Sequence, residues 1–281
     1  MPLLARMAKT DQINLRATLE CGQVFHWREL PGGAWEGLIG GHHAVVRESR
    51  HRLEVMQGDP QMVASYFAID HDLAAIYEGF PRDETMLAAL EFCRGLRIIR
   101  QPAWECLATF ITSSMKQVAH IRQMSVALRG KFGRAVRGTD LRAYPSPAAI
   151  AAASEEDLRS CGLGYRAKNL RATAQRIASG DIDLDELQSR DDAGLRDALC
   201  DLPGVGRKVA NCAMLFGFGR LAAFPVDTWI ERILKRSYWR GRGKPTPLAL
   251  EKKLSARFGP HAGYAQQYLF HHARTTQGRG G

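Results

Sequence analysis

The hydrophobic pattern divides the chain into a first part with alternating apolar positions and a helical remainder. Four segments carry apolar residues at about every second position, with turn residues between them, which predicts antiparallel strands. They are VFHWREL (24–30), AWEGLI (34–39), HHAVVRES (42–49) and HRLEVMQG (51–58). From about Gln61 onward, apolar residues recur three and four positions apart, as in amphipathic helices. Strands followed by helices favour an α+β fold over an alternating α/β fold.

A chain of 281 residues is long enough for about two domains. We expect an antiparallel β-rich domain with trailing helices at residues 1–100 and a mainly helical domain at residues 101–281. The two are expected to pack as one compact unit, with a frayed tail at residues 273–281.

One helical pattern occurs twice: a capped helix, a Gly-x-Gly break and a basic helix, at residues 154–178 and 191–217. The second break, LPGVG, predicts a helix–hairpin–helix in which Gly204 and Gly206 supply positive φ angles. The first amides of the following helix lack partners and, with the helix dipole, favour an anion. The hairpin is therefore predicted to bind a DNA phosphate without reading sequence, and a purely structural helix corner is the alternative.

Lys208 lies in the first turn of the helix after this hairpin. It shares a face with Cys212, whereas Arg207 and Asn211 form a neighbouring, more polar face. An apolar setting lowers the pKa of a lysine, and the neutral amine is the nucleophile in Schiff-base chemistry. This pattern alone leaves three roles open: nucleophile, phosphate contact and surface lysine.

Asp227 follows Pro225 and precedes another predicted helix. Thr228 and Glu231 match a capping box, to which Asp227 would add negative charge at the helix start. A carboxylate held there should stay ionised. It could then stabilise a cationic sugar transition state or relay protons for a neighbouring amine.

The formal net charge of +10 is unevenly distributed. The stretch from Trp229 to the end carries eleven Lys and Arg against two Glu, whereas residues 181–197 carry seven acids against two Arg. One basic and one acidic face would suit a protein that docks on DNA in one orientation, and a generally basic protein is the alternative. No run approaches the roughly 18 apolar residues of a membrane helix. The apolar run in the first eleven residues is too short for a signal peptide. We therefore expect no membrane association and no export.

The six cysteines form no C-x-x-C pair and no tight cluster. We therefore expect reduced thiols and neither a zinc site nor an iron–sulfur cluster. The histidine pairs at 42–43 and 271–272 lack spaced carboxylates or thiols, which disfavours a metal site there.

Six motifs in order, between about Cys21 and His271, resemble the 8-oxoguanine DNA glycosylase family of the helix–hairpin–helix, Gly/Pro-Asp superfamily. They are CGQVFHWRE with WEG, IIRQPAWECLATFITSS, CGLGYRAKNL, LCDLPGVGRKVANC, FPVDTW and GPHAGYAQQYLF. The resemblance implies a monomeric glycosylase and AP lyase that excises 8-oxoguanine from double-stranded DNA. It also implies a sheet domain packed on a helical domain, with the site in the cleft between them. Such an enzyme would work at the nucleoid in the cytoplasm of a bacterium or in a eukaryotic nucleus.

The resemblance assigns roles to individual residues. Lys208 would attack C1′ of a flipped nucleotide, expel the base and form an imine, while Asp227 supports the developing positive charge. The base would be held by Gly22, Cys212, Gln266 and Phe270. The Gly22 carbonyl would accept from N7–H of the oxidised base, whereas unmodified guanine has a repelling lone pair there. Without the resemblance, Cys212 and Phe270 look like core residues and Gln266 like a surface amide.

The chain departs from the family where the opposite base is read. The family usually has asparagines and then an arginine after ITSS, and here the positions hold Met115, Lys116, Gln117 and His120. Methionine can wedge into a base stack but cannot read a cytosine edge. Arg166, next to Tyr165, matches the remaining cytosine-reading arginine, so discrimination of the opposite base should be weakened. Trp229 replaces the usual histidine, which would alter a phosphate contact or the gating of the pocket.

The resemblance further implies one structural monovalent cation, held at the hairpin by the carbonyls of Cys200, Leu202 and Val205, and no other cofactor. Two alternatives remain. One is a glycosylase for another damaged purine, against which the hairpin lysine and the missing cysteine cluster argue. The other is a non-catalytic helix–hairpin–helix DNA-binding protein, which explains the charge and the glycines but not the co-occurrence of Lys208 and Asp227 with the residues assigned to the base.

Overall fold

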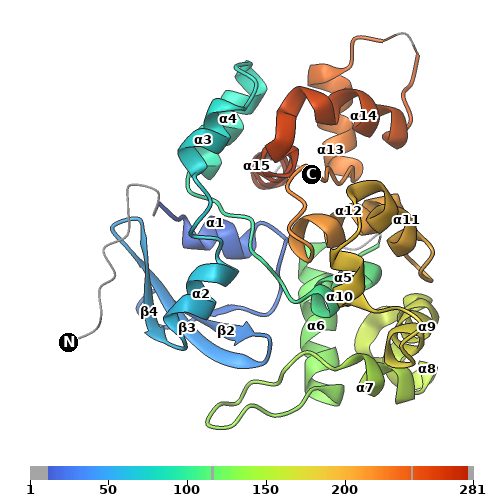
Figure 1. Ribbon diagram of the computed structural model, residues 1–281. Helices are drawn as coiled ribbons and strands as arrows, with labels where there is room; N and C mark the ends of the chain where they lie inside the picture. Colours follow the sequence, from blue (N-terminus) through green and yellow to red (C-terminus); the bar gives the residue numbers. More distant parts are fainter. Residues whose placement is uncertain (1–11, 115–116, 242, 278–281) are drawn as a thin grey trace.

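The computed structural model of the protein describes residues 12–114, 117–241 and 243–277. Four antiparallel strands form one sheet in the order β1-β2-β3-β4 (Figure 1). They are β1 (Arg28–Glu29), β2 (Ala34–Ile39), β3 (His42–Ser49) and β4 (Arg52–Gln57). The predicted strands are confirmed, but the first is shorter than expected. Val24, Phe25 and Trp27 are all buried instead of alternating between two faces, so residues 24–27 enter the core as an irregular segment.

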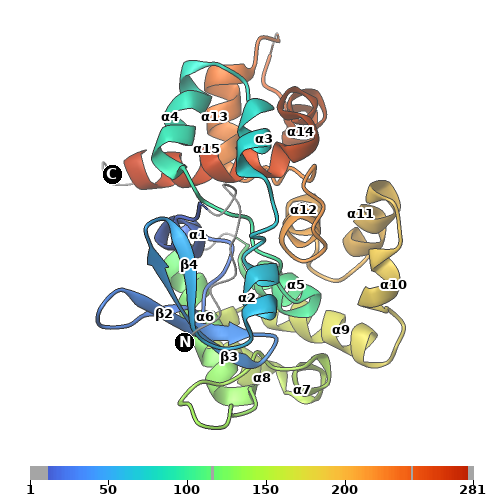
Figure 2. The same ribbon diagram turned by 60° about the vertical axis from the view of Figure 1, so that its left-hand side comes forward.

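A separate apolar cluster joins the sheet to α1 (Leu15–Glu20) and α2 (Pro60–Tyr66) (Figure 2). Trp27 and Trp35 lie in this cluster, and the Trp27 indole donates a hydrogen bond to the Tyr66 hydroxyl at 3.2 Å. The sheet thus has its own small core next to the larger core of the helical part.

The remainder of the described chain is helical, as predicted for an α+β fold. The helices are α3 (Leu73–Glu78), α4 (Glu84–Cys93), α5 (Ala103–Thr112), α6 (Val118–Phe132), α7 (Pro147–Ala152), α8 (Glu155–Leu158), α9 (Arg166–Ala178), α10 (Leu184–Gln188), α11 (Asp192–Cys200), α12 (Arg207–Phe216), α13 (Thr228–Ile233), α14 (Pro247–Leu254) and α15 (Ala262–Gln277). Within the described residues, none of these helices is both long enough and apolar enough to span a bilayer.

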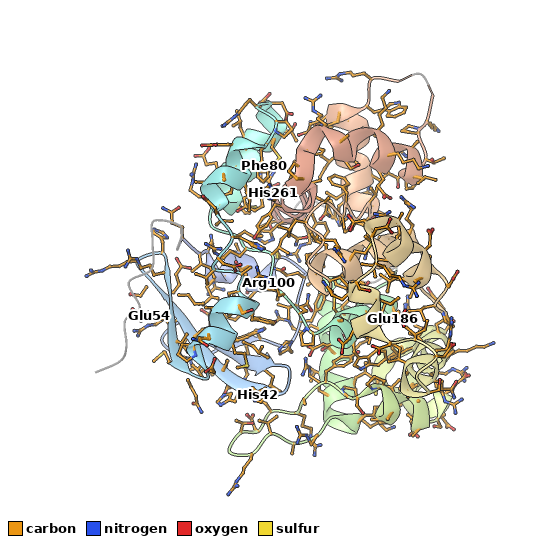
Figure 3. The ribbon with its side chains drawn as sticks, in the orientation of Figure 1. His42, Glu54, Phe80, Arg100, Glu186 and His261 are labelled. Atoms are coloured by element: carbon orange, nitrogen blue, oxygen red, sulfur yellow. The ribbon has the colours of Figure 1, made fainter. Side chains whose placement is uncertain are left out.

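The helices α3 and α4 come from the first hundred residues but pack beside α13 and α15, away from the sheet (Figures 1 and 2). Phe80, labelled in Figure 3, meets the ring of Tyr268 edge-on, with centroids 5.7 Å apart. The Tyr77 hydroxyl lies 2.8 Å from that of Tyr268. The first hundred residues therefore contact the helical part on two sides.

Both predicted hairpins are present. In the second, the two glycines differ in backbone conformation and in surroundings. Gly204 has φ +80°, and an added Cβ would lie 2.7 Å from Asn169 Cβ, so both the turn and the packing on α9 require glycine. Gly206 has φ −88°, so the expected positive φ at this residue is wrong. It is the N-cap of α12, and an added Cβ would meet nothing within 4 Å, so this glycine leaves the surface beside the first amides of α12 open.

Candidate active site

A pocket of about 990 Å³ lies between the segment that precedes the sheet and the helices α5, α6, α12, α13 and α15. Ten residues assigned from the sequence line it: Gly22, Gln117, Gly204, Gly206, Lys208, Cys212, Asp227, Trp229, Gln266 and Phe270. The fold thus brings the assigned nucleophile, carboxylate and base-contacting residues to one cavity.

Lys208 enters the pocket from the first turn of α12. Its Nζ lies 3.5 Å from Ser113 Oγ and 5.2 Å from the centre of the Phe110 ring. From Val209 to Phe216 every residue of α12 is buried, so the backbone that carries the lysine is held on all sides. The side chain therefore faces an aromatic ring and a hydroxyl group, consistent with the expected apolar setting.

The neighbouring face of α12, predicted to be a more polar stripe, carries polar side chains that bond within the protein. Asn211 is fully buried, accepts a hydrogen bond from Arg196 Nε at 2.9 Å and donates to Phe224 O at 3.3 Å. Arg207 forms a two-pronged ion pair with Glu251 of α14, at 2.7 and 2.8 Å. These polar groups bond within the protein because α11 and α14 cover this face.

Asp227 is itself the N-cap of α13. Its Oδ1 accepts a hydrogen bond from the Ile230 amide at 2.8 Å, and its backbone is extended. The predicted capping box is wrong by one position, because Thr228 is already the first helical residue and Glu231 pairs with Lys235.

Burial raises the pKa of Asp227 above the ordinary value of an aspartate. The hydrogen bond from Ile230 and the charge of Lys208 act in the opposite direction, but burial outweighs them. Burial therefore acts against the expectation that this carboxylate is readily ionised.

The base-contacting residues assigned from the sequence line the pocket from three parts of the chain: the segment before the sheet, α12 and α15. Gln266 and Phe270 stand on α15, one turn apart. Gln266 is only 4% exposed, and its Oε1 has no hydrogen-bond partner among the described residues. Burial raises the pKa of the Cys212 thiol to about 11, so this group is a protonated, weakly polar wall. The unpaired amide oxygen of Gln266 leaves an acceptor for a bound molecule.

Gly22 adopts φ +87°, and a Cβ added there would lie 3.3 Å from Phe270 Cε1. We expect Gly22→Ala to lower the free energy of unfolding by about 1–3 kcal/mol through backbone strain and to slow any reaction that needs this wall. Gly32 is the matched control, since its φ is also +87° but nothing lies within 4 Å of its added Cβ. Chemical denaturation should show the backbone strain in both Gly22→Ala and Gly32→Ala. Weaker binding of a ligand in the pocket should occur in Gly22→Ala alone, because only there does the added Cβ crowd Phe270. Equal binding by the two variants would contradict the placement of Phe270 against Gly22.

Three further assigned residues lie outside this pocket. Arg166 is buried, and its guanidinium donates to the carbonyls of Ser114 (2.9 Å from Nε) and Leu163 (3.2 Å). Tyr165 is 62% exposed, and the Arg166 guanidinium lies 4.4 Å from the centre of its ring. His120 is exposed on α6. Met115 and Lys116 lie outside the described residues, so their assigned roles stay predictions.

The hairpin carbonyls assigned to a cation belong to Cys200, Leu202 and Val205. The Leu202 carbonyl accepts a hydrogen bond from the Val205 amide at 3.1 Å, which leaves it a second lone pair for an ion. The monovalent cation assigned to these carbonyls stays a prediction. In the described ranges, no group of three or more His, Cys, Asp or Glu could hold a metal ion.

Several residues that line the pocket were not assigned from the sequence. They include Phe25, Phe110, Ser113, Gln267 and Arg274. Phe110 and Ser113 lie within the motif IIRQPAWECLATFITSS, and the step of three between them could have placed both on one face of a helix. Gln267 and Arg274 lie two turns apart on α15. Core residues of any amphipathic helix show the same spacing, so nothing in the sequence indicates that these two residues line a pocket.

Two family models match the chain in succession. The N-terminal domain of 8-oxoguanine DNA glycosylase matches residues 6–107, and the HhH-GPD superfamily of base excision DNA repair proteins matches residues 109–260.

Curated relatives and a solved structure agree with these matches. The probable N-glycosylase/DNA lyase of Methanothermobacter thermautotrophicus is 30% identical over 93% of each chain. The N-glycosylase/DNA lyase of Saccharomyces cerevisiae is 31% identical over 92% of this chain and 83% of that protein. The 8-oxoguanine glycosylase/lyase of Clostridium acetobutylicum, solved with double-stranded DNA containing cytosine opposite 8-oxoguanine, is 28% identical. It superimposes with a TM-score of 0.89 over 95% of this chain and 93% of that one. The chain therefore belongs to the 8-oxoguanine DNA glycosylase family within the HhH-GPD superfamily.

Proposed function

We propose that this protein is a bifunctional DNA glycosylase and AP lyase that excises 8-oxoguanine from double-stranded DNA through a Schiff base on Lys208. One observation carries the proposal: Lys208, Asp227 and all four residues assigned to the base line the same pocket. Family membership supports the class of reaction, and the residues of this pocket support the individual roles. A purely DNA-binding module would not require these side chains to converge.

The proposed reaction begins with the damaged nucleotide turned out of the duplex, because its C1′ atom is inaccessible within the stack. The Lys208 amine attacks C1′ and gives up a proton to Asp227, the bond from C1′ to the base breaks, and the base leaves with the electron pair. Opening of the sugar ring then gives an imine between Nζ and C1′. Loss of a proton from C2′ expels the 3′ phosphate and cuts the strand.

Asp227 has two tasks in this scheme, both of which need its charge. The carboxylate stabilises the positive charge that develops on the sugar, and it accepts the proton that Lys208 releases. Lys208 and Asp227 line the same pocket, which supports such a transfer between them. The exposed Gly204 and Gly206, with the first amides of α12, would bind a neighbouring phosphate.

Base recognition would follow from hydrogen-bond polarity. The Gly22 carbonyl would accept from N7–H of 8-oxoguanine, while unmodified guanine would present a lone pair and leave that acceptor unpaired. Gln266 would pair with the Watson–Crick edge through its unpartnered amide oxygen and its amide nitrogen. Cys212 and Phe270 would enclose the two faces of the ring.

Trapping with borohydride tests the proposed function directly. The protein is incubated with a duplex that contains one 8-oxoguanine and is treated with sodium borohydride, which reduces an imine to a stable amine. We expect a covalent protein–DNA complex together with released 8-oxoguanine. Base release without a trapped complex would overturn the Schiff base, and neither product would leave only DNA binding.

We also propose relaxed selection of the base opposite the lesion. The guanidinium of Arg166 is already bonded to two main-chain carbonyls, and His120 and Gln117 replace the arginine and one asparagine of the family pattern. Excision rates measured for 8-oxoguanine opposite each of the four bases should therefore differ by about tenfold or less. A preference for cytosine of about a hundredfold would contradict this proposal.

A further inference from the structure

The main-chain carbonyls on both sides of Gly22 are held by long side chains. The bonds are Arg274 to the Glu20 carbonyl (2.6 Å), Gln267 to the Cys21 carbonyl (2.9 Å) and Gln101 to the Gln23 carbonyl (2.7 Å). Among the hydrogen bonds formed by the described residues, none ends on the carbonyl of Gly22. Three of four successive carbonyls are thus fixed, and the fourth is left for another donor.

The two glutamine donors are buried, and one of them is also held through its backbone. Gln267 is 2% exposed and Gln101 is 6% exposed. The backbone amide of Gln101 also donates to the Phe216 carbonyl at 2.8 Å, at the end of the helix that begins with Arg207 and Lys208. Gln101 therefore links the segment around Gly22 to the helix that carries the proposed nucleophile.

Arg274 connects the same segment to the base-stacking wall. Its guanidinium lies 5.7 Å from the centre of the Phe270 ring while it donates to the Glu20 carbonyl. The cation thus lies next to the ring that would enclose one face of the base, and it also holds the segment that presents the Gly22 carbonyl. Arg274 also lines the pocket.

We propose that Gln101, Gln267 and Arg274 form a carbonyl clamp that fixes the direction of the Gly22 carbonyl and thereby sets selectivity for the oxidised base. This inference rests on the proposed function. A glycine at φ +87° is flexible on its own, and a carbonyl that could rotate would turn away from the N7 lone pair of unmodified guanine instead of rejecting it. The clamp opposes that escape, because the carbonyls before and after Gly22 are held by buried hydrogen bonds and leave the peptide between them little freedom to turn.

Three variants test the clamp. Two substrates distinguish an effect on base recognition from an effect on the catalytic step. Gln267→Leu and Arg274→Met remove the donors with little change in volume, and Arg274→Lys keeps a cation that can still donate. Single-turnover base excision is measured on a duplex with 8-oxoguanine, and strand cleavage on a duplex with a preformed abasic site, where no base is present. Gln188→Leu is the matched control, because Gln188 also donates from Nε2 to a main-chain carbonyl, that of Phe218 at 3.3 Å, outside the pocket.

We expect each donor-removing variant to lower the ratio of excision to abasic-site cleavage about tenfold. Arg274→Lys should partly restore this ratio. The ratio should not change in Gln188→Leu. An unchanged ratio would overturn the clamp, whether both activities are normal or both fall together through a loss of folding. Failure of the unmodified protein to excise 8-oxoguanine would overturn the proposed function itself and the clamp with it.

Discussion

Lys208→Gln should abolish borohydride trapping and slow strand cleavage at an abasic site by about 10³-fold or more. Glutamine keeps most of the length of the side chain and its packing over Phe110, but its amide cannot form an imine. The loss should be as large on a preformed abasic site as on a duplex with 8-oxoguanine, because the nucleophile serves both steps. Gel analysis of the reduced complexes and of the cut strand measures both effects.

Lys131→Gln is the matched control for this experiment. Lys131 also lies near an aromatic ring, 5.7 Å from the centre of Phe132, and pairs with Asp157 at 2.6 Å, but it does not line the pocket. Its loss should leave trapping intact. A trapped complex of normal yield with Lys208→Gln would show that another amine forms the imine.

Asp227→Asn should slow base excision about 10²- to 10³-fold with little loss of stability. Asparagine caps a helix about as well as aspartate, so the hydrogen bond from the Ile230 amide can persist. The negative charge is lost, however, and with it the stabilisation of the cationic sugar and a proton acceptor for Lys208. Thermal melting and single-turnover excision, measured together, separate the two roles.

Asp191→Asn supplies the control, since Asp191 caps α11 by accepting from the Gly194 amide at 2.8 Å and lies outside the pocket. It should match Asp227→Asn in melting and retain full activity. The pH profile gives a second readout. Because burial raises the pKa of Asp227, excision should decline with falling pH earlier than an exposed aspartate would allow, and this decline should be absent in Asp227→Asn. Equal excision by Asp227→Asn and the unmodified protein would rule out a role for the charge.

The periodicity of the chain was sufficient to predict the sheet, the two hairpins and the position of Lys208 at the start of a helix. These features depend on local patterns, such as the alternation in residues 42–49 and the glycines of LPGVG. The N-cap of α13 was assigned one residue too late, because Asp227 and Thr228 are both good caps and only the backbone geometry decides between them.

Features that depend on distant partners could not be predicted. Nothing near Asn211 in the sequence indicates Arg196 or the Phe224 carbonyl, and nothing near Arg207 indicates Glu251. The residues around Gly22 are harder still, because every residue has a carbonyl and its direction leaves no trace in the amino-acid letters. The roles of Gly22 and Gln266 came from resemblance for this reason.

The position of α15 also determines when the pocket can form during synthesis. The pocket is lined in part by Gly22, which lies against Phe270, and by Gln266 and Phe270 of α15, a helix that ends at Gln277. A ribosome that has made everything up to α14 has already synthesised Lys208 and Asp227 but not Gln266 or Phe270. If the proposed roles hold, a chain stopped before α15 would carry the nucleophile Lys208 without the base-contacting residues Gln266 and Phe270.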